Sequence, residues 1–84
     1  MVNKKILKIR KQLDKLDNQL LFLIKRRANL VSKILSNKKL KKEIIDKKRI
    51  KTILSNISRK SKIKKIDIKI TSKIWKAMIN AFIE

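Results

Sequence analysis

The chain has 84 residues and a formal net charge of +20, because it carries 26 Lys and Arg but only 6 Asp and Glu. It contains no Cys and no His, which excludes disulfides, thiolate metal sites and catalysis by either side chain. Gly and Pro are also absent, and most turns and sheets depend on them. The composition therefore predicts an all-α fold, organised as a single helical domain over residues 1–84.

The first predicted helix runs from about Lys5 to about Lys39. Alternating steps of four and three residues define an apolar stripe that also contains charges: Ile6, Arg10, Leu13, Asp17, Leu20, Ile24, Arg27, Val31, Ile34 and Lys38. With a rise of about 1.5 Å per residue, this helix would be about 50 Å long. A helix of that length cannot fold back inside one small protomer, so a partner chain is expected.

A second, shorter helix is predicted after a break over residues 36–43. Ser36 and Asn37 open this break because both residue types compete with the helical backbone for hydrogen bonds. The second helix begins near Ile44. Its apolar positions are Ile45, Ile50, Ile53, Leu54 and Ile57.

A third helix is predicted after another break, over residues 58–65. Asp67 is expected to be its N-cap, because a carboxylate is favourable at a helix N-terminus. Its apolar positions are Ile70, Ile74, Trp75, Met78, Ile79, Phe82 and Ile83. The sequence therefore predicts one long helix followed by two shorter ones.

The cations inside the apolar stripe indicate a binding site. Arg27 and Lys38 share a face and lie roughly 16 Å apart along the axis, so both can reach one anionic ligand. Arg10 points about 100° away from Arg27, so it would reach the equivalent pocket of an antiparallel partner instead. A single stripe cation can also be a snorkelling or register-setting residue. Several unpaired buried cations are costly, however, and together with Asp46 and Arg49 they favour an anion site.

The sequence "LKIRKQLDKLDNQLLFLIKRRANLV", residues 7–31, resembles the first helix of the AroQ-class chorismate mutases. The positions that fit the family pattern are Arg10, Leu13, Asp14, Leu16, Asp17, Leu20, Leu21, Leu23, Ile24 and Arg27. Lys38 then falls on the family's catalytic lysine. Two later segments, "IIDKKRIKTIL" and "IWKAMINAFIE", resemble the second and third helices of the family.

The resemblance implies an intertwined, all-helical homodimer that rearranges chorismate to prephenate without a metal or cofactor. In the family pattern, Arg27 and the partner's Arg10 bind the carboxylates, and Lys38 contacts a carboxylate and the ether oxygen. Asp46 would face the ring hydroxyl, and Arg49 would support the pocket. Catalytic roles are thus implied for Arg10, Arg27 and Lys38. Such an enzyme acts in aromatic amino acid biosynthesis and is expected in the cytoplasm.

Because the sequence departs from the family pattern in three places, an enzyme of reduced activity is an open alternative. Ile50 stands where the family has Glu, and Phe82 stands near the place of a small polar residue. The chain also stops at Glu84, short of the family's Gln or Glu. Sliding the third helix so that Asn80 and Glu84 take those roles would rotate it by about 200° and disrupt its apolar phase.

Other functions remain as alternatives. One is a chorismate-mutase-like domain that binds or regulates without efficient catalysis, and another is removal of pyruvate from isochorismate. A third is a basic helical nucleic-acid binder, in which the stripe cations would matter no more than any other Lys. Lys, Ile and Asn codons are rich in A and T, so codon composition is the favoured explanation of the charge, and no nucleic-acid partner is expected. No association with a membrane is expected either, since the sequence shows no signal peptide and no apolar span.

Overall fold

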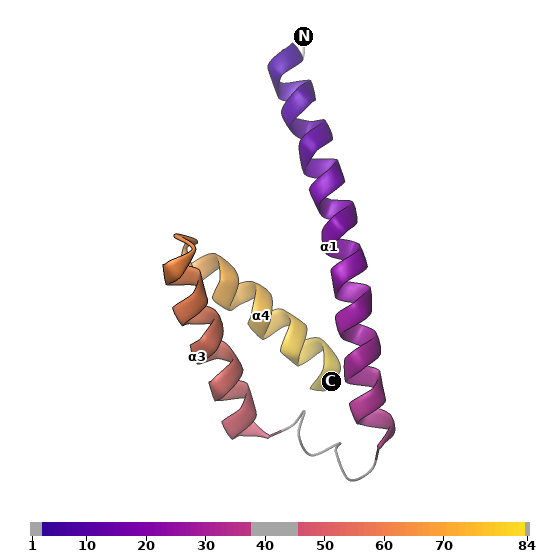
Figure 1. The fold of residues 1–84 in the computed structure, drawn as a ribbon, viewed down its shortest axis with the longest axis vertical. Helices are drawn as coiled ribbons and strands as arrows, with labels where there is room; N and C mark the ends of the chain where they lie inside the picture. Colours follow the sequence, from indigo (N-terminus) through magenta and orange to yellow (C-terminus); the bar gives the residue numbers. More distant parts are fainter. Residues whose placement is uncertain (1–2, 38–45, 84) are drawn as a thin grey trace. The chain divides into compact units, whose positions relative to one another are not determined.

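The computed structural model describes residues 3–37 and 46–83, and these residues form three α-helices and no strand (Figure 1). Helix α1 spans Lys4–Ser36, α3 spans Lys47–Ile63 and α4 spans Ile68–Ile83. The prediction of an all-α fold with one long helix and two shorter ones is therefore confirmed. The chain divides into two compact units, Met1–Leu30 and Val31–Glu84.

Helix α1 is continuous over 33 residues, or about 50 Å. Its first turn is capped by Asn3, whose Oδ1 accepts a hydrogen bond from the backbone N–H of Lys5 at 2.9 Å. At the other end, the hydroxyl of Ser36 donates to the carbonyl of Lys33 at 2.8 Å. The helix thus ends where the predicted break begins, and not near Lys39. Lys38 and Lys39 themselves lie outside the described residues.

The apolar stripe of α1 is open to solvent in the single protomer. No residue of α1 is buried. Ile6 is 44% exposed, Leu20 is 54% exposed and Ile24 is 46% exposed, and only toward the C-terminal end of α1 are the stripe residues Val31 and Ile34 half-buried. Because fully burying one such side chain contributes about 1.5–3 kcal/mol, this stripe is a large unused source of stability.

Helix α3 begins at Lys47 and not near Ile44, because Asp46 caps it. The predicted break over 58–65 is wrong for residues 58–63, since the helix continues to Ile63. The hydroxyl of Ser61 donates to the carbonyl of Ile57 at 2.6 Å, so this serine is satisfied inside the helix. The neighbouring Arg and Lys are good helix formers. Ile44 and Ile45 lie outside the described residues.

The turn after α3 closes without a glycine. The backbone N–H of Ile66 donates to the carbonyl of Ser61 at 2.8 Å, and that of Lys65 donates to the carbonyl of Lys62 at 3.1 Å. This pair of bonds is the Schellman motif, which requires a left-handed residue between helix and exit. Lys65 occupies that position with φ 59°.

Replacing Lys65 with Gly is expected to raise the free energy of unfolding by about 1 kcal/mol, because glycine adopts positive φ without the steric cost of a Cβ. Urea unfolding monitored by circular dichroism measures the change. Lys64→Gly is the matched control, since it removes the same charge at a residue with φ −85°. That control is expected to lower stability, and a gain in both variants would show that charge, not backbone geometry, is responsible.

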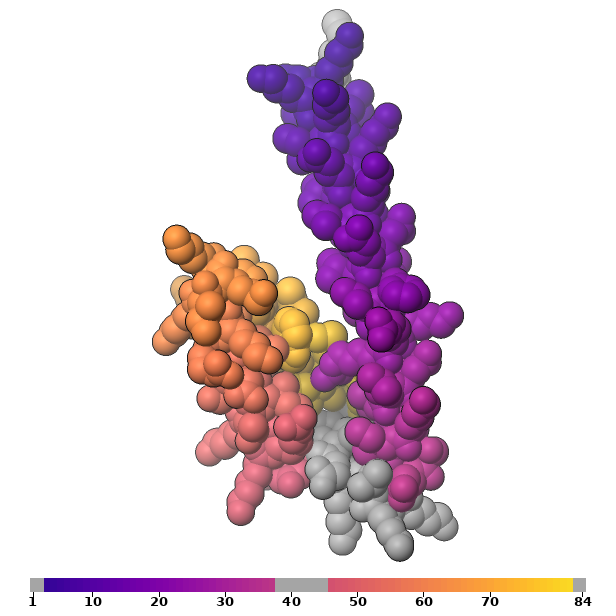
Figure 2. Space-filling view, viewed as in Figure 1, coloured from indigo at the N-terminus to yellow at the C-terminus, as the bar shows by residue number. Residues whose placement is uncertain are grey.

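Helices α3 and α4 pack against each other as a hairpin (Figure 2). Asp67 is the N-cap of α4 as predicted, because its Oδ1 accepts from the backbone N–H of Lys69 at 2.9 Å. Between the helices, the hydroxyls of Ser61 and Thr71 lie 2.8 Å apart, and both residues are buried. The Ser61 hydroxyl lies 2.6 Å from the Ile57 carbonyl and the Thr71 hydroxyl lies 3.4 Å from the Ile68 carbonyl. Each hydroxyl therefore also has a backbone acceptor, and either one can donate in the pair. Among the described residues, Ile79 is the only buried hydrophobic one.

Candidate active site

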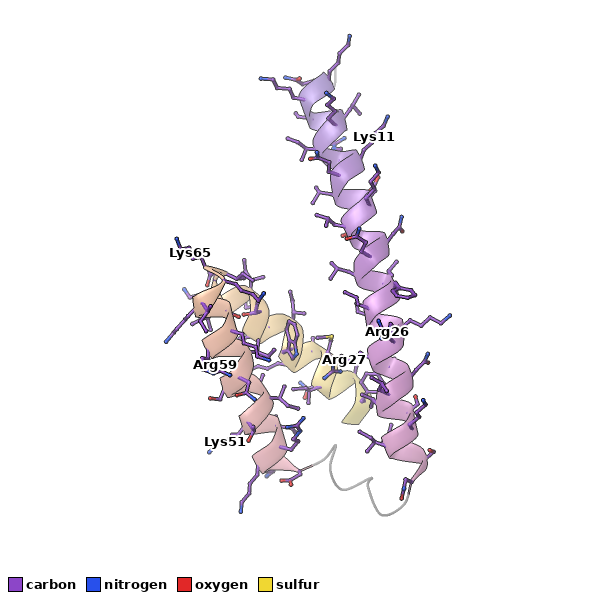
Figure 3. The ribbon with its side chains drawn as sticks, viewed as in Figure 1. Lys11, Arg26, Arg27, Lys51, Arg59 and Lys65 are labelled. Atoms are coloured by element: carbon purple, nitrogen blue, oxygen red, sulfur yellow. The ribbon has the colours of Figure 1, made fainter. Side chains whose placement is uncertain are left out.

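Two of the predicted site cations, Arg10 and Arg27, lie on α1, and Figure 3 labels Arg27. Arg10 is exposed and Arg27 is half-buried. The helix is unbroken between them, so the 17 residues that separate them correspond to about 25 Å along the axis and about 100° of rotation. A small ligand bound at Arg27 therefore cannot also contact Arg10 of the same helix. The third predicted cation, Lys38, lies outside the described residues.

Asp46 directly precedes α3, and Arg49 lies in its first turn. Both residues are exposed. Their spacing of three residues places them on one side of the helix. Asp46 also has a structural function that the sequence analysis missed: its Oδ1 accepts from the backbone N–H of Lys48 at 2.9 Å. The signal was present, since an Asp or Asn directly before a helical run also marks the caps Asn3 and Asp67. The other carboxylate oxygen is not used by this cap.

Ile50 and Phe82, the two apolar departures from the family pattern, are both half-buried in apolar rows of their helices. Ile50 is half-buried and belongs to the row that continues through Leu54 and Ile57 to Ser61, the residue that contacts Thr71. On α4, half-buried Phe82 continues the row of Thr71, Trp75 and Met78. Asn80 is exposed, as expected from the apolar phase of this helix. Both departures therefore continue the helix rows that contain Ser61 and Thr71, the residues in contact between α3 and α4.

The chemistry open to these residues is that of charge recognition. A guanidinium such as that of Arg27 can bind a carboxylate through two parallel hydrogen bonds. The chain has no His and no Cys, so a reaction at this site proceeds without those nucleophiles and general bases. An intramolecular rearrangement of a bound anion is a reaction that needs only positioning and electrostatic stabilisation.

These features define an all-helical protein with cations set into the apolar stripe of its long helix. Residues 9–84 match the family model of Chorismate mutase type II, and the chain belongs to this family. Its activity is accordingly that of a chorismate mutase, an isomerase that rearranges chorismate to prephenate in aromatic amino acid biosynthesis. Searches of curated proteins and of solved structures each found no match. In the part of the chain that the structure describes, no helix has the length and apolar character required to cross a bilayer.

Proposed function

We propose that two copies of this chain form an intertwined homodimer with two active sites in the cytoplasm, each built from a single-domain protomer. Each site binds chorismate through Arg27 and Lys38 of one protomer and through the partner's Arg10. Asp46 and Arg49 complete the pocket, and no metal or cofactor takes part. The observation that carries this proposal is the placement of Arg10 and Arg27 on one unbroken helix, in a chain of this family.

The need for a partner follows from the burial of apolar side chains. With only Ile79 buried among the described hydrophobic residues, a protomer by itself has almost no core. Small domains with so little buried surface depend on oligomerisation for stability. A second α1 laid along the first would cover the open stripe, and a two-fold axis would give both copies the same contacts.

The partner also completes the site. If the two long helices run antiparallel, the N-terminal half of one lies beside the C-terminal half of the other. Arg10 then approaches Arg27 of the opposite protomer, which it cannot do within its own helix. Such sharing makes the dimer a requirement for catalysis as well as for stability.

The proposed mechanism is electrostatic. Arg27 and the partner's Arg10 each hold one carboxylate of chorismate and keep the substrate in its compact conformer, which lowers the entropy cost of reaction. The ether C–O bond breaks as the new C–C bond forms, and no proton or electron leaves the substrate. Lys38 stabilises the negative charge that develops on the ether oxygen. Asp46 accepts a hydrogen bond from the ring hydroxyl, and Arg49 supports the pocket beside it.

The test is the loss of chorismate absorbance with purified protein, together with identification of prephenate as the product. Turnover in a dimeric sample is the expected result. A folded dimer without turnover would contradict the active site proposed here. Binding of chorismate without turnover would then assign the chain a binding role, and pyruvate released from isochorismate would assign the lyase reaction.

Asp46 allows its two roles to be separated. Asp46→Asn is expected to keep the stability of α3, because Asn and Asp cap helices equally well, while kcat/KM falls about 10-fold with loss of the charged acceptor. Asp46→Ala is expected to lose about 1 kcal/mol of stability in addition. Steady-state kinetics and urea unfolding on the same samples measure both. If Asp46→Ala, which removes the acceptor, retains full activity, the cap is the residue's sole contribution and its substrate contact is excluded.

A further inference from the structure

Helix α1 carries a second regular row of side chains, separate from the apolar stripe. Steps of three and four residues connect its members, which we call the basic row: Lys4, Lys8, Lys11, Lys15, Asn18, Phe22 and Arg26. All seven are exposed. They extend over 22 residues, or about 33 Å of helix. The row contains five cations and no acidic residue.

The basic row lies on the side of α1 opposite the apolar stripe. Phe22 follows Leu20 of the stripe by two residues, which is about 200° of rotation. Figure 3 shows Arg26 of the row and Arg27 of the stripe leaving α1 in different directions. A partner that covers the stripe therefore leaves the basic row open, and the row is distinct from the residues proposed to bind chorismate.

Phe22 is the unusual member of this row. It is 60% exposed, although the chain has only two Phe, one Trp and no Tyr. An open hollow lined by Asn18, Gln19, Phe22 and Leu23 lies beside the ring. Two amide side chains, which can donate and accept hydrogen bonds, thus border an accessible aromatic face, and Arg26 follows one turn later.

Composition alone favours no nucleic-acid partner, but the alignment of five cations with exposed Phe22 on one side of α1 is an observation that composition does not contain. We propose that the basic row binds single-stranded nucleic acid, with phosphates on the lysines and a base stacked on Phe22. A cationic track with an aromatic side chain within it is the combination that binds single strands without sequence preference. The net charge of +20 adds long-range attraction for a polyanion. A bilayer surface fits less well, because the aliphatic side chains needed for insertion lie on the opposite side of α1. Duplex fits less well because its bases are not free to stack.

The test is fluorescence anisotropy of a labelled oligothymidine with the full chain at several salt concentrations. Lys8→Gln, Lys11→Gln and Lys15→Gln combined are expected to reduce the slope of log K against log salt by about 2, at about 0.7 per phosphate contact. The matched control combines Lys51→Gln, Lys62→Gln and Lys76→Gln, which removes the same charge elsewhere and should leave the slope unchanged. Phe22→Leu keeps an apolar side chain but removes the ring, and should weaken binding about 10-fold. Circular dichroism verifies that each variant is folded.

Three results would overturn the proposal. The first is an equal loss of slope in the control variant, which would assign binding to total charge and not to the row. The second is full affinity in Phe22→Leu together with equal affinity for duplex. The third is binding to phosphatidylglycerol vesicles that depends on the row while oligothymidine binding does not. None of these readouts depends on turnover of chorismate, so the outcome is separable from that of the proposed enzyme function.

Discussion

Arg27→Ala is expected to lower kcat/KM for chorismate by about 10²–10³-fold while the dimer remains folded. Arg27 is a half-buried cation of the apolar stripe of α1, and its guanidinium is the group proposed to hold a substrate carboxylate. Removing it eliminates a charged donor that positions the dianion for rearrangement. Arg27→Lys is expected to recover only part of the loss, because an ammonium keeps the charge but cannot form two parallel hydrogen bonds.

Arg59→Ala is the matched control for Arg27→Ala. Arg59 is an exposed arginine of α3, and its removal changes the net charge by the same amount. We expect full turnover in this variant, measured by the same absorbance assay. An equal loss in both variants would indicate that general charge attracts the substrate, and a loss in neither would remove Arg27 from the active site.

Leu20→Asp is expected to destroy the dimer. Leu20 lies in the apolar stripe and is 54% exposed in the single protomer, so the proposed dimer would bury it. An aspartate there would be an unpaired charge too short to reach solvent, at a cost of about 3–5 kcal/mol per protomer. That is comparable to the whole stability of a small domain. Analytical ultracentrifugation and circular dichroism should show an unfolded monomer.

Lys25→Asp is the control for Leu20→Asp, because it places the same side chain at an exposed position of α1 outside the stripe. It should remain a folded dimer whose melting temperature rises with protein concentration, as mass action requires. A folded dimer in Leu20→Asp would contradict the dimer proposal, since the stripe would then lie outside the interface. A folded monomer would contradict the dependence of folding on dimerisation.

The long helix and its charges could be predicted from sequence because one periodic pattern runs through the whole segment. Arg10 and Arg27 keep the separation that an unbroken helix imposes. The extent of α3 was harder to predict, because Ser58 and Ser61 suggest a helix break when only the sequence is considered. The buried contact between Ser61 and Thr71 explains why the helix continues, and it depends on the packing of α4.

Local backbone bonding accounts for the remaining differences. The family pattern assigns Asp46 to the substrate pocket alone, and the structure adds that its carboxylate caps α3. The left-handed turn at Lys65 had no glycine to mark it, so the pattern gave no indication that a Schellman motif would form there. Ile50 departs from the family pattern in sequence, and its half-buried position in the apolar row of α3 indicates why an apolar residue fits there.

Arg10 and Arg27 are proposed to act together across two protomers, and mixing two inactive variants tests this sharing. Arg10→Ala and Arg27→Ala chains, carrying different affinity tags, are unfolded together and refolded in equal amounts. Half of the dimers would then be mixed, and each would contain one site with both arginines intact and one site with neither. We expect the mixture to recover about a quarter of the wild-type turnover. Mixed dimers isolated by both tags but without turnover would contradict it, because each site would then draw both arginines from a single chain.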